Sequence, residues 1–181
     1  MDTVERLVRS TRELLWERGY VGTSPKAIQQ RSGVGQGSMY HHFTGKSDLA
    51  LAAIEQTGAE LRASAATQLD GPGSARDRIT AYLRREREVL KGCPIGRLTQ
   101  DPDILADEQL RTPVGETLDW VRGRIAEILA EGNAAGEFDL DPEAVAATLL
   151  AVLQGGYVLA RATNSIEPYD KAIAGVLSLL H

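Results

Sequence analysis

The sequence predicts an all-α protein, and three observations support that fold class. Apolar residues recur at helical spacing along most of the 181 residues, beginning with Val4, Leu7 and Val8 near the N-terminus. No alternating pattern of the kind that indicates β-strands extends over a useful length. Segments that break helices, such as residues 70–74 (DGPGS), separate the periodic stretches.

The first two helices are predicted from their ends. A helical period covers residues 2–18, and Gly19 ends it. The second helix should begin near Pro25, because proline loses no hydrogen bond at the first helical position and Ser24 can accept from a helix N–H group. Gly33 should end this helix in the left-handed conformation that favours glycine.

The third helix, from Gln36 to Phe43, is unusually polar and aromatic for its length. A short helix of this kind, held at a steep angle to the preceding one, suits insertion into the major groove of DNA. Glutamine and serine can hydrogen-bond to base edges, whereas tyrosine and histidine can donate to phosphate oxygens. The pattern therefore predicts a helix-turn-helix that binds DNA.

The same stretch resembles the N-terminal DNA-binding domain of TetR-family transcriptional regulators. The resemblance is close over roughly the first fifty residues, and beyond them it is a likeness of all-helical architecture only. The matching positions are Leu14-Leu15, Gly19-Tyr20, Thr23-Ser24, Ile28, Gly33-Val34, Gly37-Ser38, Tyr40-His41-His42-Phe43, Lys46 and Asp48-Leu49. It implies a helix-turn-helix DNA-binding domain at residues 1–49 and a helical effector-binding and dimerisation domain at residues 50–181.

One departure concerns Gly35 and Gln36, where TetR-like sequences often carry serine and then lysine. Glycine caps a helix less well than serine, and glutamine removes one positive charge. We expect the fold to be unaffected, whereas the base preference is left open and the salt dependence of DNA binding should be slightly lower.

Eight residues are predicted to contact DNA, partly from their chemistry and largely from the resemblance. They are Thr23, Ser24, Gln36, Gly37, Ser38, Tyr40, His41 and Lys46. Thr23, Ser24 and Lys46 lie at helix starts, where N–H groups without helical partners favour phosphate. His42 and Phe43 are predicted instead to pack inside the small domain.

Charge and composition favour a soluble DNA-binding protein over a disulfide-rich or membrane protein. The net charge is −5, but residues 1–49 carry seven Lys/Arg against five Asp/Glu, and the remainder carries 13 against 20. The basic excess therefore coincides with the predicted DNA-binding segment. The single cysteine excludes an internal disulfide and fits a reducing compartment. No apolar run approaches the roughly 20 residues of a membrane helix and no signal core begins the chain, so we expect a cytoplasmic protein without a membrane partner.

The chain is not expected to be an enzyme. Two of its three histidines, His41 and His42, lie in the DNA-binding segment, and as neighbours they face different sides of a helix. No arrangement typical of a nucleophile and base, a phosphate loop or a metal site is present. We therefore predict no catalytic residue, no metal and no cofactor.

The remaining sequence predicts helices at residues 46–69, 74–91, 95–100, 107–132 and 142–162, with a last one opening at Pro168. Asp101-Pro102-Asp103 is predicted to end the short helix at 95–100, and Pro113 to kink or delay the next. The helix at 142–162 is apolar nearly all round, so it should be buried on most sides.

In TetR-like proteins the two C-terminal helices of each subunit pair into a four-helix bundle, so the resemblance implies a homodimer. The predicted interface consists of Leu150, Leu153, Gly155, Val158, Ile173, Val176 and Leu177. A symmetric dimer could place two recognition helices in successive major grooves, about 34–36 Å apart or somewhat more, on a palindromic operator. The alternative is that these helices form only the core of a monomer.

The resemblance also implies a small-molecule effector between the middle helices. The candidate residues are Tyr82, Cys93, Arg97, Leu98, Trp120, Arg124 and Tyr157, although residues like the apolar ones are more often core than ligand contacts. Arg97 and Arg124 could orient an anionic or polar group. Residues 92–96 resemble a segment of the drug- and flavonoid-responsive TetR subgroup, and Cys93 is read as a packed thiol, with a redox role as the alternative.

The predicted function is a ligand-responsive repressor. Its homodimer would bind a double-stranded DNA operator and be released by the effector, which would favour a conformation with the recognition helices wrongly spaced. The alternative is a DNA-binding regulator without a small-molecule ligand, either an activator or an architectural protein.

Overall fold

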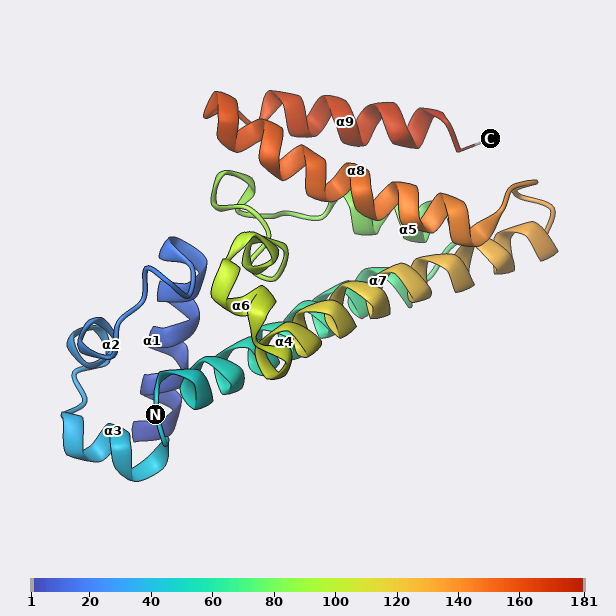
Figure 1. Ribbon diagram of the computed structural model, residues 1–181. Coiled ribbons are helices and arrows are strands. Elements are labelled where there is room, and N and C mark those ends of the chain that lie inside the picture. Colours follow the sequence, from blue (N-terminus) through green and yellow to red (C-terminus); the bar gives the residue numbers. More distant parts are fainter. Residues whose placement is uncertain (1, 181) are drawn as a thin grey trace. The chain divides into compact units, whose positions relative to one another are not determined.

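The computed structural model describes residues 2–180, which form nine α-helices and two short 3-10 helices and contain no strand, so the all-α prediction is confirmed. The helices of the first half are α1 (Thr3–Arg18), α2 (Pro25–Ser32), α3 (Gln36–His42), α4 (Lys46–Leu69) and α5 (Ala75–Arg84) (Figure 1). Those that follow are η1 (Val89–Lys91), η2 (Gly96–Gln100), α6 (Pro102–Ala106), α7 (Glu108–Ala134), α8 (Pro142–Thr163) and α9 (Glu167–Ser178).

Two compact units make up the described chain. Unit 1 contains the residues up to Glu60 together with Pro94–Thr117, and unit 2 contains Leu61–Cys93 together with the residues from Leu118 onward. Both α4 and α7 contribute residues to each unit. The predicted domain boundary at residue 49 stays a prediction, and these units differ from it because the segment from Pro94 packs with the N-terminal helices.

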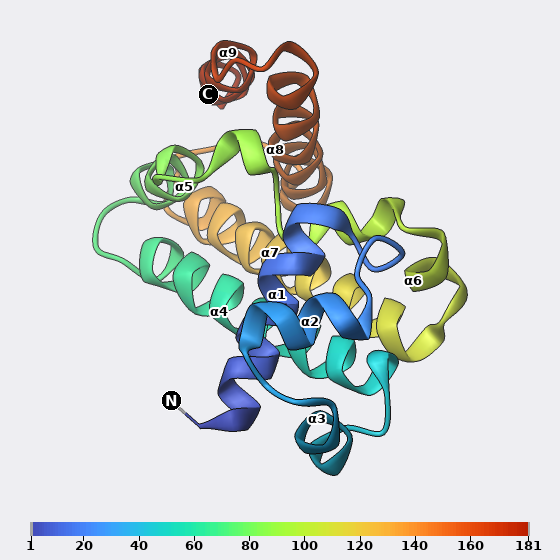
Figure 2. The same cartoon turned by 90° about the vertical axis from the view of Figure 1, so that its left-hand side faces the viewer.

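The predicted starts and ends of the first helices are confirmed. The Ser24 side chain accepts a hydrogen bond from the Ala27 N–H at 3.2 Å, and Pro25 occupies the first position of α2. Gly33 ends α2 with φ of +65°, in the left-handed region that favours glycine. Figure 2 shows α2 lying across α1, with the turn to α3 following it.

Buried apolar residues hold the three short helices of unit 1 together. Ile28 of α2, Met39 of α3 and Leu7 of α1 are each at most 1% exposed. Arg6 of α1 adds a polar link, because its Nε donates to the Ser32 carbonyl oxygen at 3.1 Å. The C-terminal end of α2 is therefore tied to α1 as well as packed on it.

The segment between η2 and α6 differs from the prediction. Residues 96–100 form a 3-10 helix, and Asp101 starts a new helix where the sequence predicted a break. One carboxylate oxygen of Asp101 accepts the Asp103 N–H at 3.2 Å, which caps α6. The predicted end of the 95–100 helix is confirmed, but α6 was not predicted, because Asp101-Pro102 is also an N-cap followed by proline at the first helical position, the same signal that starts α8.

The predicted helix from Ser74 to about Lys91 ends early, at Arg84. The capping box between Ser74 and Asp77 starts α5 as expected. The guanidinium of Arg87 then donates to the carbonyl oxygens of Tyr82 at 2.6 Å and Leu83 at 2.9 Å. Because the last carbonyl groups of a helix lack partners within it, the Arg87 side chain stabilises the C-terminal end of α5. No glycine or proline marks this end in the sequence.

In unit 2, α8 and α9 form an antiparallel pair joined at Asn164, which has φ of +49° (Figure 1). Asp141 caps α8 as predicted, accepting hydrogen bonds from the N–H groups of Glu143 and Ala144.

Pro113 lies inside α7, in unit 1, and does not delay the start of that helix.

The expectation that α8 is buried on most sides is wrong for the single chain. Val158 and Leu159 of α8 are 54% and 51% exposed.

By length and composition alone, α8 is also the one helix within residues 2–180 that could cross a membrane, which counting apolar residues did not predict. The core helix of a soluble protein passes the same test, so this finding is weak evidence for a membrane protein.

Candidate nucleic-acid interface

Helix α3 presents nearly all of its side chains to solvent. Met39 is its only buried residue, and Phe43, directly after it, is also buried. The exposed residues are Gln36, Gly37, Ser38, Tyr40, His41 and His42. Met39 and Phe43 are four positions apart and so share the inward face of the helix, which leaves the polar residues on the outward face.

The predicted packing role is confirmed for Phe43 and wrong for His42. Phe43 is 9% exposed, whereas His42 is exposed and meets His41 edge to face, with ring centroids 4.9 Å apart. His42 directly precedes Phe43, so it points away from the face that Phe43 and Met39 bury. The outward surface of α3 is therefore larger than the sequence predicted.

The start of α3 has no side-chain cap. Gly35 occupies the N-cap position in an extended conformation and makes no capping hydrogen bond. A Cβ added at Gly35 or Gly37 would meet no atom within 4 Å, so neither glycine is required by packing within the chain. Both therefore leave room for close approach of another molecule to the backbone.

The structure places the two residues at the start of α2 differently. Ser24 is exposed, and its hydroxyl caps the helix. Thr23 is only 1% exposed, and its hydroxyl donates to the Gly19 carbonyl oxygen at 2.7 Å. Thr23 was predicted to contact phosphate, but its side chain supports the turn between α1 and α2 from the inside.

Lys46, the first residue of α4, is half-buried and stacks on Tyr20. Its Nζ lies 3.8 Å from the centroid of the Tyr20 ring, a cation–π contact. Burial lowers the pKa of Lys46 and also raises the pKa of Tyr20. The ammonium group is thus held over the Tyr20 ring, where Asp101 and Asp103 stabilise its charge.

A second set of contacts fixes the loop between α1 and α2, and sequence reasoning missed it. The second carboxylate oxygen of Asp101 accepts the N–H groups of Tyr20 at 2.7 Å and Val21 at 3.0 Å. Arg97 donates to the Trp16 carbonyl oxygen at the end of α1. These long-range bonds join the helix-turn-helix to the η2–α6 segment within unit 1. The only sequence signal for these bonds is Asp101-Pro102, which is typical of a helix start.

The predicted effector residues do not form one group within a single unit. Arg97 and Leu98 belong to unit 1, whereas the other five belong to unit 2. Tyr82, Cys93 and Tyr157 are buried, and Trp120 is 37% exposed. Arg124 pairs with Asp70 at 2.6 Å and with Glu127 at 2.7 Å. The effector site stays a prediction, but Arg124 already has carboxylate partners.

The predicted dimer residues divide between the core and the surface of the chain. Leu153, Ile173 and Val176 are at most 7% exposed because they pack α9 onto α8 within one chain. Leu150, Gly155 and Leu177 are half-buried, and Val158 is exposed. The surface also includes three large apolar residues that were not predicted, namely Leu159, Ile166 and Leu179, at 51%, 54% and 75% exposure. The dimer interface stays a prediction.

Helices α1, α2 and α3 form a helix-turn-helix in which α3 exposes polar side chains and no acidic one, an arrangement typical of DNA-binding regulators. Family comparisons agree. The model described as "Bacterial regulatory proteins, tetR family" matches residues 7–53, and the one described as "Tetracyclin repressor-like, C-terminal domain" matches residues 75–176. The chain belongs to the TetR family of transcriptional regulators, and the resemblance seen in the sequence is confirmed.

The likeness extends along most of the chain. The transcriptional regulator AcuR of Cereibacter sphaeroides is 30% identical over 91% of this chain and 78% of AcuR. The repressor NemR of Escherichia coli is 27% identical over 99% of this chain and 94% of NemR. The crystal structure of reduced NemR has a TM-score of 0.88 and covers 100% of this chain and 98% of its own, at 26% identity. A CifR variant complexed with 26-bp double-strand operator DNA shares the fold, with a TM-score of 0.83 over 98% of this chain and 96% of its own, at 22% identity.

Proposed function

We propose that this protein is a repressor that binds a palindromic, double-stranded DNA operator as a homodimer and is released by a small-molecule effector. The observation that carries the proposal is the outward face of α3, which exposes six of its seven residues and contains no acidic one. Relatives support it, since NemR is a repressor by name and CifR is complexed with operator DNA. Such a regulator works in the cytoplasm, where the operator lies.

Each exposed side chain of this face has a suitable task. Gln36 and Ser38 can hydrogen-bond to base edges in the major groove. Tyr40, 48% exposed, and His41 can donate to phosphate oxygens and so fix the position of the helix. Ser24 and Lys46 flank the face at the starts of α2 and α4, where phosphate is favoured.

DNA contact is tested by gel shift with the duplex that the parent protein selects from a random library. We expect Tyr40→Ala to weaken binding about tenfold or more, because a hydrogen bond to a charged group contributes roughly 1.5–3 kcal/mol. Thr112→Ala, at an exposed position of α7 outside every predicted site, is the control and should bind like the parent. If Tyr40→Ala and Lys46→Ala both bind as tightly as the parent, the assigned DNA-binding face is wrong.

The dimer rests on the exposed apolar side chains of α8 and α9. Large exposed apolar side chains on a soluble chain indicate an interface, and such residues are Val158 and Leu159, which are neighbours on α8, and Leu179, directly after α9. Val158→Glu should shift the protein from dimer to monomer in sedimentation velocity. Thr148→Glu, at an exposed polar position of the same helix, is the matched control. A monomeric parent, or a dimeric Val158→Glu variant, would contradict the assignment.

The effector is tested by a thermal-shift screen combined with the same gel shift. A compound that stabilises the protein and releases it from DNA supports the proposal, because a ligand can shift the DNA equilibrium only through different affinities for the two states. Intact DNA binding with no stabilising compound would favour a regulator without a small-molecule ligand.

A further inference from the structure

Unit 2 contains an unusual group of polar aromatic and basic side chains, which we call the Tyr–Arg cluster. Its members are Tyr82 of α5, Arg85 and Arg87 directly after α5, Tyr157 of α8 and Tyr169 of α9. The three tyrosines are 2%, 8% and 5% exposed, respectively, and both arginines are half-buried. The cluster therefore places three phenols and two guanidinium groups among residues of α5, α8 and α9 and the segment that follows α5.

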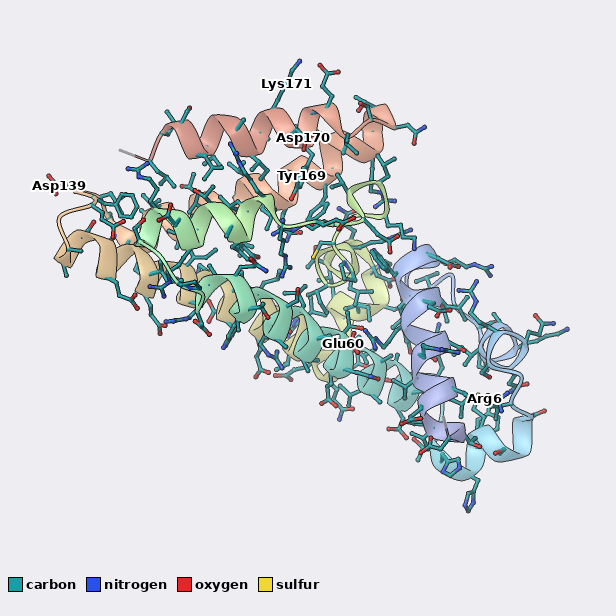
Figure 3. All side chains as sticks on the ribbon, turned by 180° about the vertical axis from the view of Figure 1, so that it is seen from behind. Arg6, Glu60, Asp139, Tyr169, Asp170 and Lys171 are labelled. Carbon is teal, nitrogen blue, oxygen red and sulfur yellow. The ribbon has the colours of Figure 1, made fainter. Side chains whose placement is uncertain are left out.

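Ring contacts join the members in two groups, and the positive charge of Arg87, which partly offsets the rise that burial causes in the pKa of both Tyr157 and Tyr169, links one group to the other. The rings of Tyr157 and Tyr169 have centroids 5.2 Å apart. The guanidinium carbons of Arg85 and Arg87 lie 5.0 and 5.1 Å from the centroid of the Tyr82 ring. In Figure 3, Tyr169 points from α9 toward the other helices of unit 2, whereas Lys171 points away from them.

Two buried polar atoms of the cluster make no well-aligned hydrogen bond among the described residues, although the Tyr157 side chain lies close enough to the Tyr169 hydroxyl to offset, by hydrogen bonding, part of the rise that burial causes in its pKa. They are the hydroxyl oxygen of Tyr169 and Nε of Arg87. Native structures leave few buried polar groups unsatisfied, because each one has lost its bonds to water without replacement. Both atoms can donate a hydrogen bond, so the missing partner is an acceptor.

The two arginines also lack a negative partner. Within residues 2–180 no carboxylate lies at ion-pair distance from Arg85 or Arg87, whereas Arg78, Arg122 and Arg124 each pair with one. The hydrogen bonds of Arg85 and Arg87 go to neutral oxygens, the Ser64 hydroxyl and backbone carbonyls. Burial and the neighbouring Arg87 both lower the pKa of Arg85, so the site disfavours its own positive charge.

We propose that the Tyr–Arg cluster is the site that recognises the effector, and that it takes a small organic carboxylate. The carboxylate oxygens accept hydrogen bonds from the Tyr169 hydroxyl and Arg87 Nε, and the anion balances the two guanidinium charges. The proposal rests on the effector-released repressor proposed above and specifies the chemical class of that effector.

The surroundings favour a carboxylate over phosphate. Tyrosine rings and apolar helices cannot replace the water that a strongly hydrated dianion loses, whereas they suit the hydrocarbon part of an organic acid. Burial raises the pKa of all three tyrosines, so their hydroxyls keep the protons that they would donate to an anion. An aromatic acid fits best, because its ring can pack against those of Tyr157 and Tyr169.

Binding is tested on the full chain by calorimetry and thermal shift, with benzoate, phenylacetate and hexanoate as probes. Each acid is compared with its neutral amide, which has nearly the same shape and no charge, and with inorganic phosphate. We expect at least one acid to bind and raise the Tm while its amide does not. Equal binding of acid and amide, tighter binding of phosphate, or no binding of any acid at millimolar concentration would overturn the proposal.

The Tyr169→Phe variant locates the site, because it removes only the hydroxyl and keeps the ring. Its Tm without ligand should equal or exceed that of the parent, and the Kd of the bound acid should rise about tenfold or more. Arg85→Gln should weaken the acid similarly, with Arg84→Gln, an exposed arginine of α5, as the control that binds like the parent. Arg87 is left intact because its guanidinium also caps α5. Unchanged acid affinity in both Tyr169→Phe and Arg85→Gln would overturn the assignment.

Gel shifts separate this inference from the proposed function. If a different compound releases DNA equally well from the parent and from Tyr169→Phe, the repressor stands and the carboxylate site is wrong. If an acid binds with the expected dependence on Tyr169 but leaves DNA binding unchanged, the site stands and release by an effector fails.

Discussion

The Asp101 carboxylate connects two parts of unit 1 that are eighty residues apart in sequence, and its removal should weaken that unit. One oxygen accepts the N–H groups of Tyr20 and Val21, and the other caps α6. A Cβ on Gly19 would lie 2.9 Å from this carboxylate, so the glycine is needed for the approach. In Asp101→Ala the loop before α2 loses both bonds and α6 loses its cap.

The expected loss follows from these three bonds. A hydrogen bond to a charged group contributes roughly 1.5–3 kcal/mol when buried, but the loop N–H groups regain water in part, since Val21 is 59% exposed. Counting about 1 kcal/mol for each loop bond and about 1 kcal/mol for the cap gives a loss of about 3 kcal/mol. For a chain of this length that corresponds to a decrease in Tm of roughly 6–12 °C.

Urea unfolding, followed by far-UV circular dichroism, measures this free energy. Asp103→Ala is the matched control, because it removes an exposed carboxylate from the first turn of the same helix and should cost under about 1 kcal/mol. Asp101→Asn keeps a neutral acceptor and should fall between the two variants. If Asp101→Ala loses no more stability than Asp103→Ala, the bonds to the α1–α2 loop do not stabilise the fold.

Two further predictions concern packing and pH. Gly132→Ala should destabilise the fold by about 1–3 kcal/mol in urea unfolding, because the new Cβ would lie 2.4 Å from a ring carbon of Phe138. The control Gly123→Ala meets no atom and should stabilise the fold by up to about 1 kcal/mol. Equal effects of the two substitutions on the free energy of unfolding would contradict this packing argument. The hydrogen bond from Arg12 lowers the pKa of Glu60 below 4.5, so the folded state binds fewer protons there than the unfolded state. The stabilisation from the ionised Glu60 is present above pH 4.5 and is lost as the pH falls through the lowered pKa. The free energy of unfolding of Glu60→Gln should therefore decrease less on acidification than that of the parent. Parallel pH profiles of the two proteins would refute this coupling of protonation to stability.

Helix starts were predictable from sequence because the bonds that make them are local. Ser24 and Asp141 each accept from N–H groups two or three residues away, and both caps are confirmed. The recognition helix was predictable for the same reason, since Gly33 and the residues that follow it define its turn. Local chemistry thus sufficed to predict the position of α3, whose outward face is proposed to bind DNA.

Ends set by long-range or backward contacts were not predictable. The end of α5 depends on Arg87, whose side chain turns back to bind the helix carbonyls. The start of α6 depends on Asp101, which was read as a breaker. The apolar pattern of α8 likewise could not separate Leu153, which is buried, from Val158, which is exposed. Amphipathic periodicity shows that a face is buried and does not say which chain buries it.

The choice of basic residues for the effector shows the same limit most clearly. Arg97 and Arg124 were favoured because they lie among the middle helices, yet the structure binds one to a backbone carbonyl and the other to carboxylates. Arg85 and Arg87 belong to residues 84–88 (RRERE), where alternating charge suggests a solvated, self-neutralising run. Because α5 ends inside this run, its acidic members are exposed while Arg85 and Arg87 turn toward buried tyrosines. The separation of charges on which the proposed anion site depends therefore arises from the helix end, and it can be predicted only when that end is known.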